Sequence, residues 1–244
     1  MGMITVMVTA IIMGTRMAMI TTITMTDTVV LARLMTWLSP AFPVGAFAYS
    51  HGLERAIHDG LIRDRTSLSE WLEALLERGS AWNDAVLLAE AWRSTVAGTD
   101  IVDVAELAEA ISGSRERHME TRLQGGAFVD AMAAWSGERA MDGDGPVAYP
   151  VAVGGAAARH SIALEDTLTA YLHAFASNLV QASVRLVPLG QRDGVATLAA
   201  LESVALRTAR RAAVSTLDDL GSCTIRADIM SMNHETQYSR VFRS

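Results

Sequence analysis

The sequence predicts an all-α protein, a single-domain bundle of about eight or nine helices around a central apolar helix at about residues 164–187. Apolar residues recur at helical spacing through most of the chain, and no window alternates as a β-strand does. The stretch 168–187 has a single charge, Arg185, and neither Gly nor Pro. A helix that is apolar on most sides belongs in the interior of a large helical protein.

The other helices follow from the same spacing and from the residues that stop helices. The first must end before Pro40, because proline cannot continue a helix. Ser67 and Glu70 have the spacing of a capping box in front of the third helix, and Gly125-Gly126 indicates a point of close packing. Besides the central helix, helices are expected at residues 29–38, 46–59, 67–78, 82–96, 100–112, 115–135, 150–160, 195–213 and 229–234, with loops at 39–45 and 137–145.

Composition and charge restrict the class of protein. A chain of 244 residues that is 50% apolar can bury a sizeable core. Its net charge of −7 argues against a nucleic-acid binder, which would carry a basic excess. The single cysteine, Cys223, leaves no internal disulfide and no cysteine-cluster metal site, so a cytoplasmic location is expected.

The first 26 residues differ from the rest of the chain. They are rich in Met, Thr and Ile, and Arg16 is their only charge. They lack the early basic region of a signal peptide. We expect residues 1–26 to be a disordered leader or an over-annotated start, with translation beginning at Met25, and residues 27–244 to form the folded domain.

A polar seam crosses the central helix. Asn178, Gln181 and Arg185 stand at i, i+3 and i+7 and therefore share one face. Such a seam either packs against a neighbouring helix through paired polar groups or lines a polar cavity or an interface. A membrane span is a poorer interpretation, because spans rarely carry this much Asn, Gln and Arg.

The sequence contains no recognised catalytic signature: no phosphate-binding loop, HExxH, GxSxG or dinucleotide fingerprint. The six histidines are scattered, and His173 is expected to be a satisfied core histidine. We therefore expect no enzymatic activity and no catalytic, cofactor or metal residues. The alternatives are a helical small-molecule-binding protein, an enzyme without a recognisable motif that uses Glu116 or Asp166 as a base, or a membrane-associated protein.

Four blocks, in order, resemble the UreF family of urease accessory proteins. They are SPAFPVGAFAYSHGLE at 39–54, YPVAVG at 149–154, SNLVQASVRLVPLGQ at 177–191 and DIMSMNHETQYSRVFRS at 228–244. The resemblance covers residues 29–244, within which Ser222-Cys223 and Asn233 depart from the pattern of the family. It implies a non-enzymatic, all-α homodimer that helps deliver nickel into apo-urease.

The resemblance also implies the partners. It predicts binding to a UreD-type protein, also called UreH, and recruitment of the GTPase UreG, with nickel at most in transit rather than held as a cofactor. Neither nucleic acid nor a membrane is expected as a partner.

The first and last blocks are the candidate partner-binding segments. Aromatic residues on a loop made rigid by two prolines favour a recognition surface, although the same residues also suit a structural turn. The C-terminal tail, about residues 218–244, is expected to order on a partner, and the alternative is that it folds back onto its own helices. The candidate residues are Pro40, Phe42, Pro43, Gly45, Phe47, Tyr49, Ser50, Glu54, His234, Glu235, Gln237, Tyr238, Arg240, Phe242 and Arg243.

Overall fold

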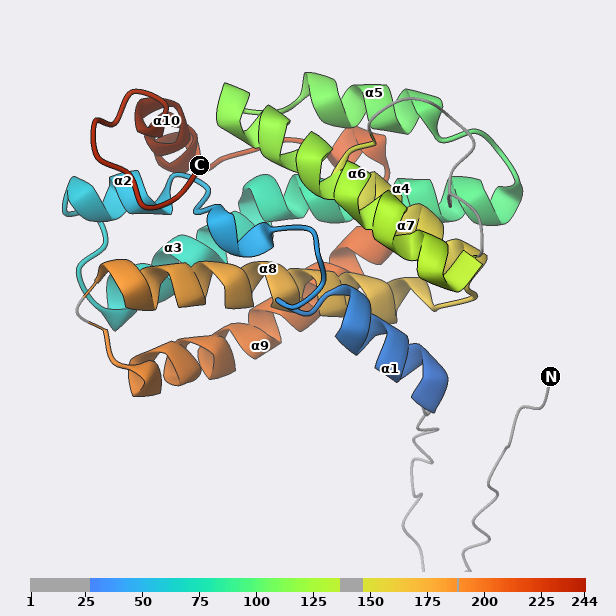
Figure 1. Ribbon diagram of the computed structural model, residues 1–244, viewed down its shortest axis with the longest axis horizontal. Coiled ribbons are helices and arrows are strands. Elements are labelled where there is room, and N and C mark those ends of the chain that lie inside the picture. Colours follow the sequence, from blue (N-terminus) through green and yellow to red (C-terminus); the bar gives the residue numbers. More distant parts are fainter. Residues whose placement is uncertain (1–26, 137–146, 188) are drawn as a thin grey trace, which may run out of the picture.

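The chain is all-α, as predicted. The computed structural model describes residues 27–136, 147–187 and 189–244, and these residues form helices and no strand (Figure 1). The predicted leader at 1–26 and the predicted loop at 137–145 lie outside the described residues. In chain order the elements are α1 (Thr28–Trp37), the 3₁₀ turn η1 (Ala46–Ala48), α2 (Leu53–His58), α3 (Arg65–Arg78), α4 (Ser80–Ala97), α5 (Val102–Ala110), α6 (Arg115–Ser136), α7 (Tyr149–Arg159), α8 (Leu164–Leu186), α9 (Gln191–Val214), the 3₁₀ turn η2 (Leu217–Asp219) and α10 (Ile225–His234).

Helices α4 and α7 form the tightest pair in the core. Every residue from 150 to 157 in α7 is buried, because its small side chains let the two backbones approach closely. At Gly154 an added Cβ would stand 2.3 Å from the carbonyl oxygen of Leu88. Helix α7 is therefore more enclosed than α8.

Helix α8 packs against α9 on one side and against α4, α2 and α3 on others (Figure 1). Leu168, Leu172 and Leu179 are fully or almost fully buried, as the apolar pattern indicates. One stripe nevertheless faces solvent. His173 lies on it and is exposed, so its prediction as a core histidine is wrong: apolar sequence neighbours do not bury a residue whose face points outward.

The start of α3 differs from the prediction. Asp64, not Ser67, is the N-cap residue: its carboxylate accepts the Ser67 amide at 2.8 Å, and the Ser67 hydroxyl accepts the Asp64 amide at 3.2 Å. The capping box therefore begins one turn earlier than the Ser67–Glu70 spacing indicates. The predicted break between α3 and α4 lies at Gly79 as expected.

The segment after Pro43 is more irregular than the single helix predicted for residues 46–59. Gly45, His51 and Gly52 have positive φ values of 71°, 55° and 75°, which divide it into η1 and the short α2. Gly52 also admits a close contact, because a Cβ there would stand 2.5 Å from the main-chain nitrogen of Ser231 in α10. The backbone of the first block thus lies directly against the C-terminal region.

None of the helices described is long and apolar enough to cross a membrane.

Candidate functional site

The two ends of the domain meet at one place. Residues 235–244, here called the terminal strap, run across η1 and α2, beside which the C-terminus lies in Figure 1. The Ser50 amide donates to the carbonyl oxygen of Ser244 at 2.6 Å, and the Ser50 hydroxyl donates to the same oxygen. The Arg243 amide donates to the carbonyl oxygen of Ala48 at 2.8 Å. The strap therefore pairs with the main chain of the first block.

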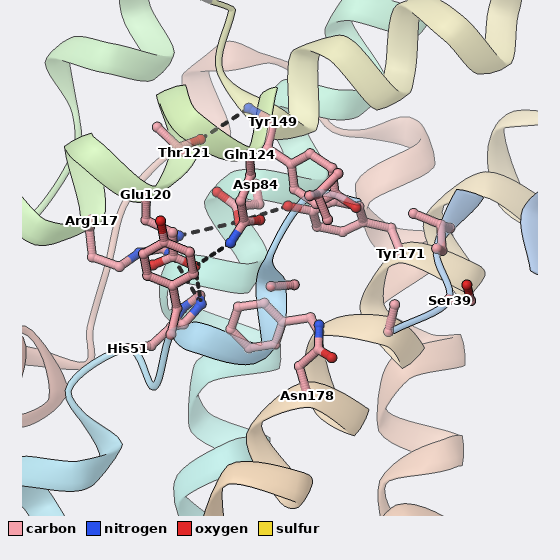
Figure 2. Close-up of a pocket in the computed structure, with 16 residues that line it drawn as sticks. Ser39, His51, Asp84, Arg117, Glu120, Thr121, Gln124, Tyr149, Tyr171 and Asn178 are labelled. Carbon is pink, nitrogen blue, oxygen red and sulfur yellow. Dashed lines mark hydrogen bonds and ion pairs between the residues drawn. The ribbon is translucent and has the colours of Figure 1, made fainter. Parts of the chain in front are cut away.

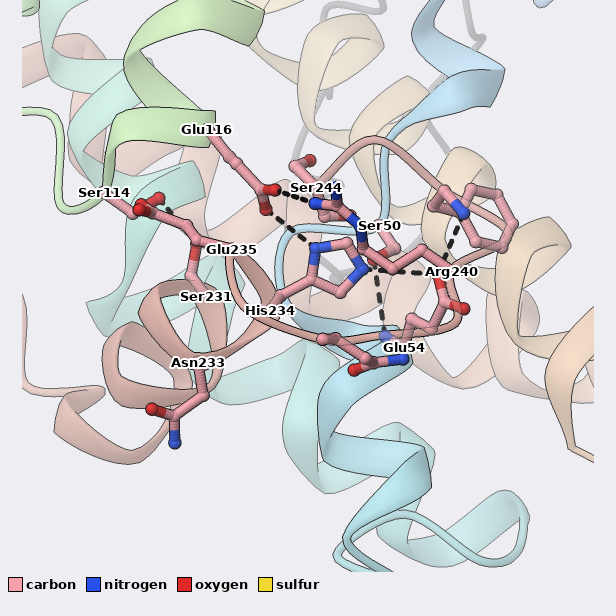
Figure 3. Close-up of polar contacts among 12 residues, drawn as sticks. Ser50, Glu54, Ser114, Glu116, Ser231, Asn233, His234, Glu235, Arg240 and Ser244 are labelled. Atoms are coloured by element: carbon pink, nitrogen blue, oxygen red, sulfur yellow. Dashed lines mark hydrogen bonds and ion pairs between the residues drawn. The ribbon is translucent and has the colours of Figure 1, made fainter.

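Glu54 of α2 fixes the middle of the strap (Figure 3). Its carboxylate accepts the main-chain amides of Val241 at 2.8 Å and Phe242 at 2.9 Å. The side chain is only 7% exposed. A buried carboxylate is tolerated when hydrogen-bond donors and charges satisfy it, and here the strap supplies the donors.

His234, at the end of α10, lies between two carboxylates and is completely buried. Its Nδ1 is 2.7 Å from Glu116 of α6, and its Nε2 is 3.3 Å from Glu54. Arg240 of the strap donates to the other oxygen of Glu116 at 2.6 Å. We call Glu54, Glu116, His234 and Arg240 the charge cluster; Figure 3 shows them between α2, α6 and the strap.

The polar seam of α8 contacts the strap at one end. The guanidinium of Arg185 lies 4.9 Å from the centre of the Phe242 ring, a cation–π contact. Phe242 itself is 5% exposed. Gln181 faces solvent, whereas Asn178 lines a cavity. The seam thus contacts the strap through Arg185 and a cavity through Asn178.

That cavity, of about 40 Å³, has a mixed polar and apolar lining and lies between α4, α6 and α8 (Figure 2). Glu120 accepts a hydrogen bond from Arg117 at 2.6 Å and lies 2.9 Å from Nε2 of His51, which is also 3.0 Å from the Arg117 guanidinium. Asp84 lies 3.5 Å from Arg117 and accepts the Tyr171 hydroxyl at 3.0 Å. Ser244 donates to Glu120 at 3.1 Å, which joins the cavity to the strap.

The charges in the cavity are largely compensated. Burial alone would raise the pKa of Glu120, but the neighbouring Arg117 and His51 outweigh it and lower the pKa to about 2. Burial raises the pKa of Asp84, against the opposing effect of Arg117. Among the described residues, no group of three or more His, Cys, Asp or Glu side chains is arranged to hold a metal ion. The arrangement suits a structural polar interior better than a metal centre.

The candidate residues from the sequence fall into two classes. One class points inward: Phe42, Tyr49, Ser50, Glu54, His234 and Phe242 are buried. The other contains exposed residues: Phe47 is 65% exposed and Tyr238 is fully exposed. Pro40, Pro43, Arg240 and Arg243 are also exposed, and Gly45, Glu235 and Gln237 are half-buried.

Phe42 is a structural residue rather than a recognition residue. Its ring packs 5.5 Å from that of Phe128 and 6.0 Å from that of Trp135, centre to centre. The aromatic loop therefore serves as a structural turn through Phe42 and leaves Phe47 exposed.

Sequence reasoning misses several residues of the site. Val241 of the strap is 61% exposed, and with Phe47 and Tyr238 it is here called the exposed trio; Ile229 and Met232 of α10 are exposed as well. The sequence analysis names Glu116 only as a candidate base and does not name Glu120. Their i, i+4 spacing at the start of α6 indicates that the two carboxylates share one face of the helix, and this spacing could have identified them together.

The chain is similar over most of its length to known proteins. The family model for UreF matches residues 62–202. Urease accessory protein UreF 1 of Brucella canis is 57% identical over 228 residues, which cover 93% of this chain and 100% of the relative. Urease accessory protein UreF of Mesorhizobium japonicum is 56% identical over 223 residues, or 90% of this chain and 100% of the relative.

Proposed function

The chain belongs to the UreF family of urease accessory proteins, and on that premise we propose that it is a non-enzymatic scaffold for nickel insertion into apo-urease. As a cytoplasmic homodimer it binds a UreD/UreH-type protein, and this complex recruits a UreG-type GTPase whose hydrolysis of GTP is coupled to metal transfer. Nickel is cargo in transit, and no cofactor is resident.

The observation that carries the proposal is the docked strap. Its main chain is fixed by Ser50 and Glu54, while Tyr238 and Val241 remain exposed on it. Tyrosine is favoured at interface hot spots, and a side chain on an ordered backbone loses less entropy on binding than one on a free terminus. The exposed trio is therefore the proposed contact surface for the UreD-type partner.

The buried candidates have a different role in this proposal. Ser50, Glu54, His234 and Phe242 position the strap and do not touch the partner. Substitution of any of these four residues therefore lowers partner capture by loosening the strap, not by removing a contact with the partner.

In this proposal, the cavity beside Asn178 is the route of nickel. The cavity offers the carboxylates Asp84 and Glu120 and the amide of Asn178, and oxygen donors hold nickel more weakly than imidazole or thiolate does. A transit site needs such weak contacts, so that the ion can leave. Unchanged urease activation by an Asn178→Leu/Gln181→Leu variant would remove this part of the proposal.

Co-expression of the full chain with its UreD-type and UreG-type partners tests the scaffold, with native mass as the readout. A discrete complex containing two copies of this chain is expected. Tyr238→Ala should lower partner capture at least tenfold while leaving the melting temperature unchanged. Val195→Ala, an exposed apolar residue (67%) on α9, is the matched control. Failure of the wild-type chain to bind either partner would overturn the proposal.

A further inference from the structure

The ring of His234 has an unusual environment, because each of its two nitrogens faces a carboxylate. Nδ1 lies 2.7 Å from Glu116 and Nε2 lies 3.3 Å from Glu54 (Figure 3). A neutral imidazole carries one N–H and one lone pair, whereas an imidazolium carries two N–H donors. Only the imidazolium can donate to both carboxylates; a neutral ring would place a lone pair against one of them.

The charges that contact the ring and its two carboxylates balance when His234 is protonated. Arg240 is the second cation, and it donates to the far oxygen of Glu116 at 2.6 Å. Two cations then match the two carboxylates, and deprotonation of His234 leaves one uncompensated negative charge. On α2, Arg55 and His58 pair with Asp59; on α6, Arg117 pairs with Glu120 and Asp84, and His118 and Arg122 pair with Glu109. The side chains of Arg115 on α6 and Arg226 on α10 are exposed, and Asp228 of α10 accepts the Ser222 hydroxyl. On the strap, Glu235 accepts the main-chain amide of Arg115 and Arg243 contacts Tyr49.

The same carboxylate that faces His234 also holds the strap. Glu54 accepts the amides of Val241 and Phe242. A ring lone pair turned toward Glu54 or Glu116 in this water-excluded site repels the carboxylate and weakens its hold. The protonation of one buried ring is thus linked to docking of the last ten residues.

We propose that His234 is a pH-sensitive latch: as an imidazolium it fastens the terminal strap to α2 and α6, and loss of its proton as the pH rises releases the strap. The sign follows from linkage. The docked state favours the protonated ring, so docking is strongest where the ring is protonated and weakens with rising pH.

The consequence for partners rests on the proposed function. The strap carries Tyr238 and Val241, so its release removes the proposed surface for the UreD-type protein. Hydrolysis of urea yields ammonia, a base. Alkalinisation by mature urease would then reduce further maturation.

Hydrogen exchange of the strap amides in the full chain, without partners, tests the latch. Protection relative to intrinsic exchange should fall as the pH rises, by at most about tenfold per pH unit, the limit for one proton. In His234→Gln, protection should be low and independent of pH. His58→Gln, a 66% exposed histidine on α2, should keep the wild-type profile. Protection that does not fall with pH in the wild type, or that falls equally in His234→Gln, would overturn the latch.

A second variant keeps the test meaningful if His234→Gln misfolds. In Glu116→Gln, the new amide can donate to Nδ1 of a neutral ring, whose Nε2–H then donates to Glu54. The strap should stay docked and lose its pH dependence. A wild-type pH profile in Glu116→Gln contradicts the proposal.

Partner capture at the same pH values separates the two proposals. Strap release at high pH with undiminished capture of the UreD-type partner supports the latch and overturns the strap as its binding surface. A pH-independent strap whose capture depends on Tyr238 overturns the latch and supports the binding surface.

Discussion

The carboxylate of Glu54 accepts the main-chain amide of Phe242 at 2.9 Å, across 188 residues of sequence. The neighbouring Val241 amide donates to the other oxygen of the same carboxylate. One side chain of the short helix α2 therefore holds the turn of the first block and the last residues of the domain in a single arrangement. The partner-binding segments inferred from sequence are one structural unit.

Replacement of Glu54 should release the strap. Glu54→Ala leaves two main-chain amides and His234 without their acceptor, and each lost buried hydrogen bond costs roughly 1–3 kcal/mol unless water replaces it. Water can replace the acceptor of the part-buried Val241 amide, but the Phe242 amide and His234 are buried, so we expect the free energy of unfolding to fall by roughly 2–6 kcal/mol and the strap amides to exchange rapidly. Urea unfolding and hydrogen exchange measure the two effects. Glu73→Ala, an exposed glutamate on α3, should change neither, and retained strap protection in Glu54→Ala would contradict this account.

Arg240→Ala should weaken the strap without unfolding the domain. Arg240 is 39% exposed, so its ion pair with Glu116 contributes at most about 1 kcal/mol after solvent screening. The melting temperature should change little, while capture of the UreD-type partner falls because the strap is docked for less of the time. Co-purification beside a thermal melt gives both readouts. Equal co-purification by the variant and the wild type would show that Arg240 does not position the strap.

Two adjacent glycines of α6 should respond oppositely to alanine. A Cβ at Gly125 would stand 1.7 Å from the carbonyl oxygen of Val147, so Gly125→Ala must separate α6 from the start of α7 and should cost several kcal/mol. A Cβ at Gly126 meets nothing within 4 Å. Gly126→Ala should therefore stabilise the protein by about 0.5–1 kcal/mol through helix propensity. Urea unfolding of both variants checks the pair, and similar effects would contradict the packing.

Helical periodicity was sufficient to predict the fold, because buried side chains dominate the pattern of α3, α4 and α7. It could not predict which face of α8 meets solvent, and His173 was misplaced for that reason. The turn at His51-Gly52 was also missed. Residues other than glycine rarely have a positive φ, and nothing in the local sequence indicates that His51 does. That turn depends on the contact with Ser231 in α10.

The site was predicted in part. Aromatic residues, prolines and arginines identified the two end blocks, but the hydrogen bond between Ser50 and Ser244 joins residues 194 apart and has no local signature. Glu116 and Glu120 resemble the solvated face of an amphipathic helix, which is the commoner use of such a pattern. Their burial becomes evident only when the strap covers them.

Acid should destabilise the domain partly through Glu120. Its pKa lies at about 2 in the folded protein, below the ordinary value of 4.5, because Arg117 and His51 stabilise the carboxylate. A depressed pKa stabilises the folded state above the unfolded value and loses that contribution as the pH falls toward the folded value, here about 3 kcal/mol in total. Burial raises the pKa of Asp84, which opposes this trend, so the wild-type slope alone does not isolate Glu120.

The comparison with Glu120→Gln isolates that contribution. The glutamine side chain cannot titrate, so the free energy of unfolding should fall less between about pH 5 and about pH 3 in this variant than in the wild type. Near neutral pH the variant should be less stable, because Arg117 loses its closest carboxylate. Glu73→Gln, at an exposed position of α3, should follow the wild-type profile. Parallel acid profiles for the wild type and Glu120→Gln would show that the Arg117–Glu120–His51 contacts do not hold the carboxylate in its charged form.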